Sequence, residues 1–252
     1  MRGAWLFPSL AALLLSSCSI KEERAECPCR LEVDFLPFAA IGGIPDLQVR
    51  SGNYPPVSGL RDASSWHADI RKGVYTISVV HPGMQTQVGP DRITCPEGMV
   101  PDSIYAFAAS VDCHAEKVHV SALARKQFCT VTLREKEPTS LQYAVRSRFA
   151  AFARADLSPQ PAPLSFSTRR DPDGAIRFRL PRQGTDSGLL LAVSGTEGDA
   201  WELPLGEWME KAGYDWTLPS LEDFLLELDY TATRIQVRIL DWDGEETLTL
   251  TI

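Results

Sequence analysis

Residues 30–35 read Arg-Leu-Glu-Val-Asp-Phe, so polar and apolar side chains alternate over six consecutive positions. Successive side chains of a strand point to opposite faces, which makes this alternation typical of a half-buried β-strand. The same period of two recurs in residues 73–80, 103–111, 117–123, 127–133, 141–149, 163–168, 175–180, 188–194, 222–230, 233–240 and 246–252. The sequence therefore predicts an all-β protein.

Turn signals separate these segments. Asp173-Gly174 and Asp243-Gly244 are favourable turn pairs, and 18 prolines and 17 glycines suit many short connections. One short helix is expected from Leu205 to Ala212, because Gly213 follows it where a left-handed cap would stand. Many short strands with so little helix predict antiparallel β-sandwiches with Greek-key connections.

A charged run, Arg134-Glu135-Lys136-Glu137-Pro138, interrupts the predicted strands near the middle of the series. We interpret it as the break between two sandwiches of similar length. The predicted division gives an N-terminal sandwich over residues 27–136 and a C-terminal sandwich over residues 137–252.

The N-terminus has the pattern of a secretory signal. Arg2 is followed by an apolar run from Ala4 to Leu15, which is too short to span a bilayer. Leu15-Ser16-Ser17-Cys18 fits the lipobox of bacterial lipoproteins, in which the cysteine is acylated, typically with palmitate. We predict removal of residues 1–17, lipidation of Cys18 and a lipidated tether over residues 18–26. The alternative is an ordinary signal peptide with an incidental cysteine.

The residues after Cys18 indicate a destination. Ser19 is not the aspartate that retains many lipoproteins in the inner membrane, which favours the outer membrane. Lys21-Glu22-Glu23 resembles a basic-then-acidic tag that some Gram-negative groups use to move lipoproteins to the outer leaflet. A solvated charged tether is the alternative. The predicted location is the outer membrane, with the protein facing the cell exterior.

Five further cysteines, Cys27, Cys29, Cys95, Cys113 and Cys129, leave an odd number after acylation. Three of them, Cys29, Cys113 and Cys129, fall on the apolar faces of alternating runs, where a free thiol packs as a small hydrophobe. Burial of thiols and formation of one disulfide are both open, and the pairing is not determined. Cys27-Pro28-Cys29 lacks the two intervening residues of a zinc knuckle or redox pair, so no metal is expected.

No enzyme signature is present, and we predict no catalytic residues, no cofactor and no small-molecule substrate. His114 and His119 would face opposite sides of a continuous strand, so a shared metal is not expected. Asp186-Ser187-Gly188 is interpreted as part of a polar turn, because a second such loop or an upstream histidine element is missing. The net charge of -8 and the pI near 5.1 argue against nucleic-acid binding, which needs a basic face.

Several motifs together resemble FimB-type fimbrial anchor lipoproteins, the anchor and accessory subunits of fimbriae. Glu26-Cys27-Pro28 opens the first strand soon after the lipobox, and Gly73-Val74-Tyr75 enters a later one. The densest match is Leu203-Pro204-Leu205-Gly206-Glu207-Trp208 followed by Gly213-Tyr214-Asp215-Trp216, with Asp229-Tyr230 and Asp241-Trp242 beyond. The aromatic residues of these motifs are expected to pack the helix against a sheet.

The resemblance implies two tandem transthyretin-like β-sandwich domains and a role at the base of a fimbrium. Its partners would be fimbrial subunits, joined by strand addition, and the outer membrane, joined through the lipid. The chain is short for the family and has extra cysteines, so anchor, cap and accessory roles all stay open. A surface glycan- or protein-binding lipoprotein is the alternative function.

The C-terminal segment 246–252 places Leu248, Leu250 and Ile252 on one face and threonines on the other. Two interpretations compete. The segment is either the last strand of the chain's own second sandwich, paired with residues 233–240, or a donor strand for a neighbouring subunit.

Overall fold

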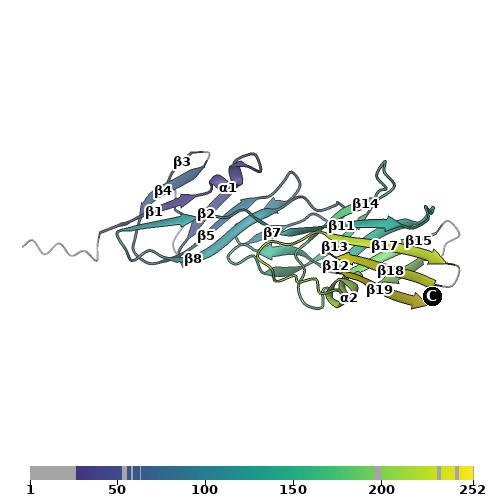
Figure 1. The fold of residues 1–252 in the computed structure, drawn as a ribbon. Helices are drawn as coiled ribbons and strands as arrows, with labels where there is room; N and C mark the ends of the chain where they lie inside the picture. The colour runs from purple at the N-terminus through teal and green to yellow at the C-terminus, as the bar shows by residue number, and fades with distance from the viewer. Residues whose placement is uncertain are drawn as a thin grey trace, which may run out of the picture.

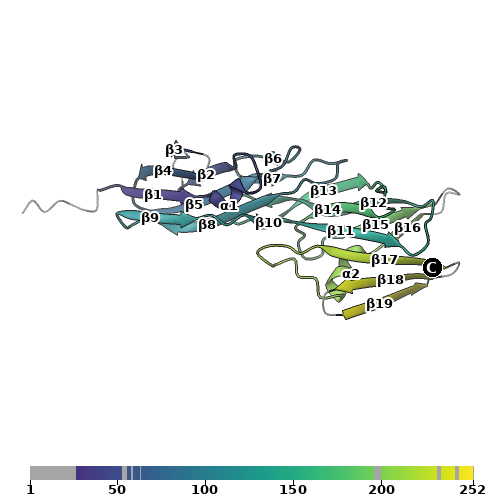
Figure 2. The same ribbon diagram turned by 45° about the horizontal axis from the view of Figure 1, so that its top comes forward.

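The computed structural model describes residues 27–52, 56–57, 59–62, 64–195, 200–231, 234–241 and 244–251, with side chains up to Asp229 apart from that of Leu60. Figures 1 and 2 show an elongated molecule of two β lobes arranged end to end. The all-β prediction is confirmed, and every strand expected from the alternating runs is present.

The first lobe contains two four-stranded sheets. One has the order β3-β4-β1-β9 and the other β10-β8-β5-β2. The strands of the first sheet are β1 (Cys29–Asp34), β3 (Leu60–Arg61), β4 (Ser65–Ile70) and β9 (Lys117–Ser121). Those of the second sheet are β2 (Asp46–Arg50), β5 (Val74–His81), β8 (Tyr105–Asp112) and β10 (Arg125–Lys126). A four-residue helix that the sequence did not predict, α1 (Leu36–Ala39), follows β1.

Strand β1 shows how the alternating sequence becomes a core. Cys29, Leu31 and Val33 are fully buried, while the polar residues between them are half-exposed. Burying each such aliphatic side chain stabilises the fold by about 1.5–3 kcal/mol. The buried residues of both sheets form one hydrophobic cluster inside the lobe.

The second lobe contains a five-stranded and a six-stranded sheet. The orders are β14-β11-β17-β18-β19 and β16-β15-β12-β7-β6, with β13 also paired to β12. The first sheet comprises β11 (Phe128–Glu135), β14 (Ile176–Pro181), β17 (Phe224–Thr231), β18 (Arg234–Asp241) and β19 (Gly244–Thr251). The second comprises β6 (Gln87–Val88), β7 (Arg92–Thr94), β12 (Gln142–Ala153), β13 (Pro159–Ser167), β15 (Leu190–Ser194) and β16 (Ala200–Leu203). The predicted helix is present as α2 (Leu205–Lys211).

The sheets cross the domain boundary that we expected at residues 136 and 137. Strand β11 pairs with β14 and β17 of the second lobe, and β7 pairs with β12. Alternation identifies a strand but carries no information on which sheet will accept it, so β11 could not be assigned from its pattern. The division of the chain into two domains stays a prediction, but β6, β7 and β11 lie in the second lobe. Arg134 and Glu135 of the charged run are the last residues of β11, and Lys136 and Glu137 form a bend after it.

Most strand pairs are antiparallel, as expected, but two are parallel. Strand β1 runs parallel to β9, and β11 runs parallel to β17. Parallel neighbours need a long crossover connection, and sequence periodicity alone does not reveal one.

A buried arginine joins the two lobes. Arg154, which is 5% exposed, lies directly after β12 in the second lobe. Its Nε donates to the hydroxyl of Ser78 on β5 at 2.9 Å, and its Nη1 donates to the carbonyl of Gly89 at 3.1 Å. Its remaining nitrogen binds the carboxylate of Asp46 on β2. The guanidinium thus ties β12 to two strands of the first lobe.

Candidate functional site

The predicted lipidation site and export tag lie outside the described residues. This applies to Cys18, to Lys21, Glu22 and Glu23, and at the other end of the chain to Ile252. Their roles stay predictions. Among the described residues, no helix is long and apolar enough to cross a membrane.

The C-terminal strand pairs with its own sandwich in this structure. Strand β19 is antiparallel to β18, with Leu248 opposite Val237 and Leu250 opposite Ile235. This is the pairing expected if segment 246–252 is the last strand of the chain's own second sandwich. Strand β19 is the last strand of its sheet, and no other strand of the described chain pairs with its outer edge. The ladder can therefore be extended by a strand from another chain.

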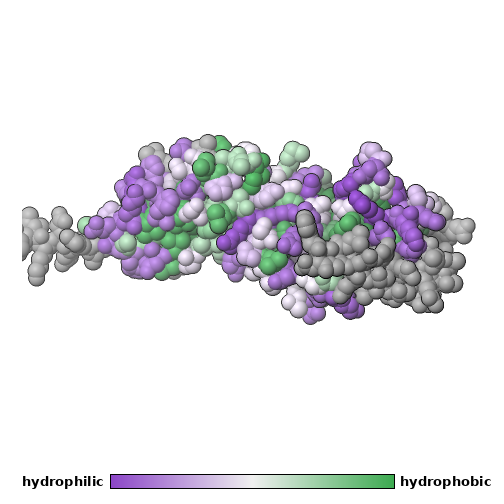
Figure 3. Space-filling model, in the orientation of Figure 1, coloured by the Kyte–Doolittle hydropathy of each residue, from purple (hydrophilic) through white to green (hydrophobic). Residues whose placement is uncertain are grey.

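The first lobe also has open strand edges, at β8 in one sheet and at β9 in the other. Strand β10 covers β8 only at Tyr105 and Ala106, so its outer edge from residue 107 to 112 faces no strand of the described chain. Strand β9 likewise pairs only with β1. Apolar side chains along both strands are only partly buried, namely Phe107, Val111, Val118 and Val120. Figure 3 shows apolar surface over the first lobe in the region of β5 and β8.

The aromatic residues of α2 and of the loop after it pack in or against the core of the second lobe. Trp208 and Trp216 are 2% and 8% exposed. Tyr214 stacks edge-on against Trp216 and Phe224, and its hydroxyl donates to the carbonyl of Glu222 at 2.8 Å. Burial raises the pKa of the Tyr214 hydroxyl, so it stays protonated. The side chains of Tyr230 and Trp242 lie outside the described part of the structure.

A residue that sequence reasoning missed holds this loop in place. Arg182 is buried, and its guanidinium donates to the Gln127 side chain at 3.0 Å and to the Leu218 carbonyl at 2.7 Å. It also donates to the carbonyl of Trp216. Burial lowers the pKa of Arg182, since the contacts that it makes here are with neutral oxygens. Arg182 directly follows β14, and nothing in the sequence around it indicates that its side chain will point inward.

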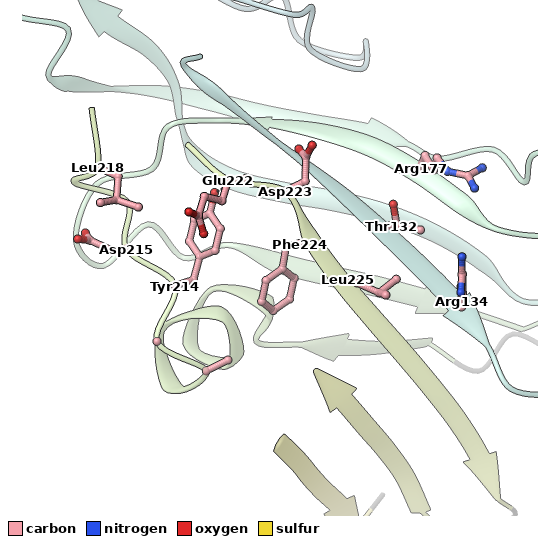
Figure 4. A pocket seen from close by; sticks show the side chains of 12 residues that line it. Thr132, Arg134, Arg177, Tyr214, Asp215, Leu218, Glu222, Asp223, Phe224 and Leu225 are labelled. Atoms are coloured by element: carbon pink, nitrogen blue, oxygen red, sulfur yellow. Dashed lines mark hydrogen bonds between the residues drawn. The ribbon is translucent and has the colours of Figure 1, made fainter. Parts of the chain in front are cut away.

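The loop borders a cavity of about 520 Å³ beside β11 and β17. Figure 4 shows Tyr214, Glu222 and Asp223 at one end of this cavity and Arg134 and Arg177 at the other. The Asp223 carboxylate accepts from the Thr130 N–H at 2.7 Å and binds Lys126. Burial raises the pKa of Asp223, but these contacts outweigh it and hold the pKa below its ordinary value.

Several ionisable groups of the cavity, among them Asp223 and Arg177, are engaged in structural contacts. Arg177 pairs with Asp171 and Asp173 at 2.6 Å each. Over the described part of the chain, no group of three or more His, Cys, Asp or Glu side chains is placed to hold a metal ion. The Asp186-Ser187-Gly188 segment forms a turn, in which the Ser187 carbonyl accepts from the Arg148 N–H at 3.0 Å.

No family model and no curated protein matches the sequence. Solved structures match in fold. A provisionally named adhesin from Bacteroides ovatus superposes with a TM-score of 0.62 at 11% identity, over 88% of this chain and 95% of that one. The fimbrial anchor protein Mfa2 from Porphyromonas gingivalis superposes with a TM-score of 0.60 at 15% identity, over 86% of this chain and 98% of that one. A provisionally named polysaccharide-binding protein from Bacteroides thetaiotaomicron has a TM-score of 0.60 at 11% identity, over 89% of this chain and 98% of that one. At these identities the likeness shows that the two-lobed fold is shared.

Proposed function

We propose that the protein is a fimbria-associated lipoprotein of the outer membrane, anchored through Cys18 and exposed to the cell exterior. The observation that carries the proposal is a lipobox on a chain whose whole two-lobed fold is similar to that of a fimbrial anchor protein. The fold likeness extends to adhesin-class proteins and supports a surface role in general. The FimB-type resemblance in the motifs narrows this role to anchoring or accompanying a fimbrium.

The shape of the molecule supports this role. Figure 1 shows β1, which follows the tether, at one end of the long axis and the end of β19 at the other. A lipid on Cys18 would hold the first lobe near the membrane, and the second lobe would point away from it. The far lobe is then the part that a fimbrial subunit reaches.

Strand addition is the mode of contact that we propose with that subunit. An added strand gains affinity from main-chain hydrogen bonds and specificity from alternate side chains. The open edge of β19 lies on the outer lobe, and in the sequence the alternation of residues 246–252 places Leu248, Leu250 and Ile252 on one face. The half-buried apolar residues along β8 and β9 make a second candidate edge on the inner lobe.

The anchor is tested with Cys18→Ala, which should abolish acylation and release the protein from membranes. Cys27→Ala is the matched control, because it removes a neighbouring cysteine and should change neither property. Incorporation of labelled palmitate and fractionation after a high-salt wash measure both outcomes. A Cys18→Ala protein that stays with the membrane would refute the lipid anchor.

The export tag is tested by replacing Glu22 and Glu23 with alanine. We expect a lipoprotein that stays membrane-bound but faces the periplasm, whereas the control Glu26→Ala should stay on the exterior. Protease treatment of intact cells measures exposure. Equal accessibility of the tag variant and the wild type would contradict the assignment.

The strand-addition proposal is tested by truncation after Glu245, with two measurements. If β19 serves only its own sheet, the melting temperature falls sharply, since three apolar side chains at about 1.5–3 kcal/mol each are lost. If its outer edge also receives a strand from a fimbrial subunit, the melting temperature falls and fimbriae are shed as well. If it serves as a donor instead, melting changes little and fimbriae are shed into the medium. Normal melting together with normal fimbrial attachment would refute both roles of the segment.

A second candidate function is glycan binding, which is favoured by the likeness to the provisionally named polysaccharide-binding protein and by the cavity beside Tyr214. Arg134→Ala, at an exposed position in the lining, should weaken retention on a polysaccharide affinity gel. Arg179→Ala, on the neighbouring strand β14 and outside the lining, is the control. Identical migration of both variants with and without polysaccharide would reject this function.

A further inference from the structure

Two of the five described cysteines lie against each other across the core of the first lobe. All five are thiols in this structure. Cys29 and Cys113 are both fully buried in the same hydrophobic cluster, and the Cys29 thiol is near enough to contribute to the raised pKa of Cys113. The two residues are far apart in the sequence: Cys29 begins β1 of one sheet, and Cys113 directly follows β8 of the other sheet.

The backbone places the pair at one end of the lobe. Cys29 is the first residue of β1 and lies opposite Ile70, the last residue of β4. Cys113 directly follows β8, and its N–H donates to the carbonyl of Gly73 at 2.8 Å. Because Ile70 and Gly73 flank the short connection from β4 to β5, both cysteines stand at the same end of the two sheets. The same connection therefore positions both thiols, one from each sheet.

The other cysteines have different surroundings. Cys95 lies beside the Thr86 hydroxyl, and Cys129 lies beside the Tyr214 hydroxyl in the second lobe. Cys27 is half-exposed and precedes β1. A disulfide between Cys27 and Cys29 would have to close across the single residue Pro28 of an extended strand entry, whereas Cys29 and Cys113 lie in one buried cluster at the same end of the lobe.

We propose that Cys29 and Cys113 form a disulfide in the exported protein, which staples the two sheets of the first lobe beside the membrane tether. The proposal rests on the export part of the proposed function, because disulfides persist in oxidising compartments outside the cytosol. The oxidant is an external disulfide, such as a thiol oxidoreductase in its oxidised form. One cysteine thiolate attacks the oxidant and forms a mixed disulfide. The second cysteine thiolate displaces the oxidant's sulfur, so two thiols are oxidised and the oxidant leaves as a dithiol.

The reaction should take place during folding, before the sheets close. Burial, with the neighbouring Cys29 thiol, raises the pKa of Cys113 to about 12. The thiolate is the attacking species in thiol–disulfide exchange, so the folded reduced pair would be oxidised slowly. An unfolded chain, with both cysteines near their ordinary pKa, reacts much faster. We therefore expect oxidation on export and not after folding.

The staple would act where force enters the molecule. A pull on the lipid reaches the fold through the first residues of β1, and Cys29 is the first residue of that strand. A covalent bond from Cys29 to Cys113 would pass the load directly to the opposite sheet, so β1 would not be peeled away from β4 and β9. It would also close a long loop in the unfolded chain, which is where a disulfide stabilises most.

The test maps disulfides in full-length protein that is extracted from membranes in the presence of N-ethylmaleimide to block free thiols. Trypsin combined with a protease that cleaves before aspartate isolates Cys113 in residues 112–117 and both Cys27 and Cys29 in residues 25–30. We expect a cross-link between these two peptides. It should persist in Cys27→Ala, which assigns it to Cys29. Blocked thiols at both Cys29 and Cys113, or a cross-link to another cysteine, would overturn the proposal.

Thermal unfolding with and without reductant provides an independent measurement. Reductant should lower the melting temperature of the first lobe by roughly 10 °C or more, given the long loop that the bond closes. Cys113→Ala should show no such dependence, whereas the control Cys129→Ala, which removes an equally buried thiol, should keep it. Reductant-independent melting of the wild type would overturn the proposal.

The failure of this proposal can be distinguished from failure of the proposed function. Acylation of Cys18 is read from the same extract. An acylated protein with a reduced pair overturns the disulfide and leaves the anchor intact. An unacylated protein overturns the anchor, and refolding of the full chain in a glutathione redox buffer then decides the disulfide. Absence of the Cys29–Cys113 link after refolding would reject it.

Discussion

Replacing Glu135 with glutamine should destabilise the second lobe far more than the same change at Glu137. The Glu135 side chain is 1% exposed and pairs with Arg170 at 2.8 Å. One of its oxygens also accepts from the Thr139 N–H at 2.9 Å, and the other accepts from the Thr139 hydroxyl at 2.6 Å and from the Tyr143 hydroxyl. Glu137, two residues along the same turn, is exposed.

The magnitude follows from the number of bonds affected. Glutamine can keep its oxygen toward Arg170 and the Thr139 N–H and donate its amide to the two hydroxyls, but every one of these bonds then loses the negative charge that strengthens it. Each hydrogen bond to a charged group contributes about 1.5–3 kcal/mol, although Arg170 is partly exposed and regains some hydration. We expect a loss of about 2–4 kcal/mol in the free energy of unfolding, whereas Glu137→Gln should change it by less than about 0.5 kcal/mol.

The assay is denaturant unfolding of both variants and the wild type between pH 3 and pH 7. Burial raises the pKa of Glu135, but the bonds from Arg170, Thr139 and Tyr143 outweigh it and hold the pKa below the ordinary value of 4.5. A depressed pKa stabilises the folded state above pH 4.5, and this contribution is lost as the pH falls through the folded pKa. The wild type and Glu135→Gln should therefore converge in acid. Equal stability of Glu135→Gln and Glu137→Gln at pH 7 would refute the reasoning.

Two further substitutions test the packing. Arg154→Met should loosen the junction between the lobes and lower the free energy of unfolding by about 2–4 kcal/mol, because the Ser78, Gly89 and Asp46 acceptors lose their donor. Limited proteolysis should cut the junction of this variant faster than that of the wild type. The control Arg146→Met, which breaks an exposed ion pair, should have no comparable effect. Trp208→Ala should lower the free energy of unfolding by about 3–5 kcal/mol, because Trp208 is buried. Trp201 is half-exposed, so Trp201→Ala should lower it by clearly less. Thermal unfolding measures both losses, and equal losses would contradict the packing of α2.

Local patterns predict the elements of this fold because each strand buries one face. Residues 30–35 and 128–135 alternate, and in both strands the apolar set lies in a core. The helix from Leu205 was also predictable, since its end is marked by Gly213, whose φ of +82° is favoured by glycine. Two short strands, β2 and β4, were not predicted although they also alternate polar and apolar residues.

Long-range assembly could not be predicted from the same patterns. Glu135 and Glu137 are identical residues in one charged run, yet only the first turns inward, where Arg170 and Tyr143 meet it. Arg154 and Arg182 look like surface residues in the sequence, and both are buried by strands from elsewhere in the chain. The N-terminal sites, in contrast, are readable only from the sequence, since they act through processing and lipid and lie outside the described residues.

The arrangement of these contacts bears on how such a protein would transmit force. A pull between the tether and the far lobe must pass through β1, the core of the first lobe and the junction at Arg154. Strand β1 lies between β4 and β9, so its ladders on both sides resist removal from the sheet. The Arg154 guanidinium then joins β12 to β2 and β5 and so links the two lobes through a buried side chain. Fold stability and attachment strength are therefore separable properties: a variant at Arg154 should weaken the connection between lobes that each remain folded.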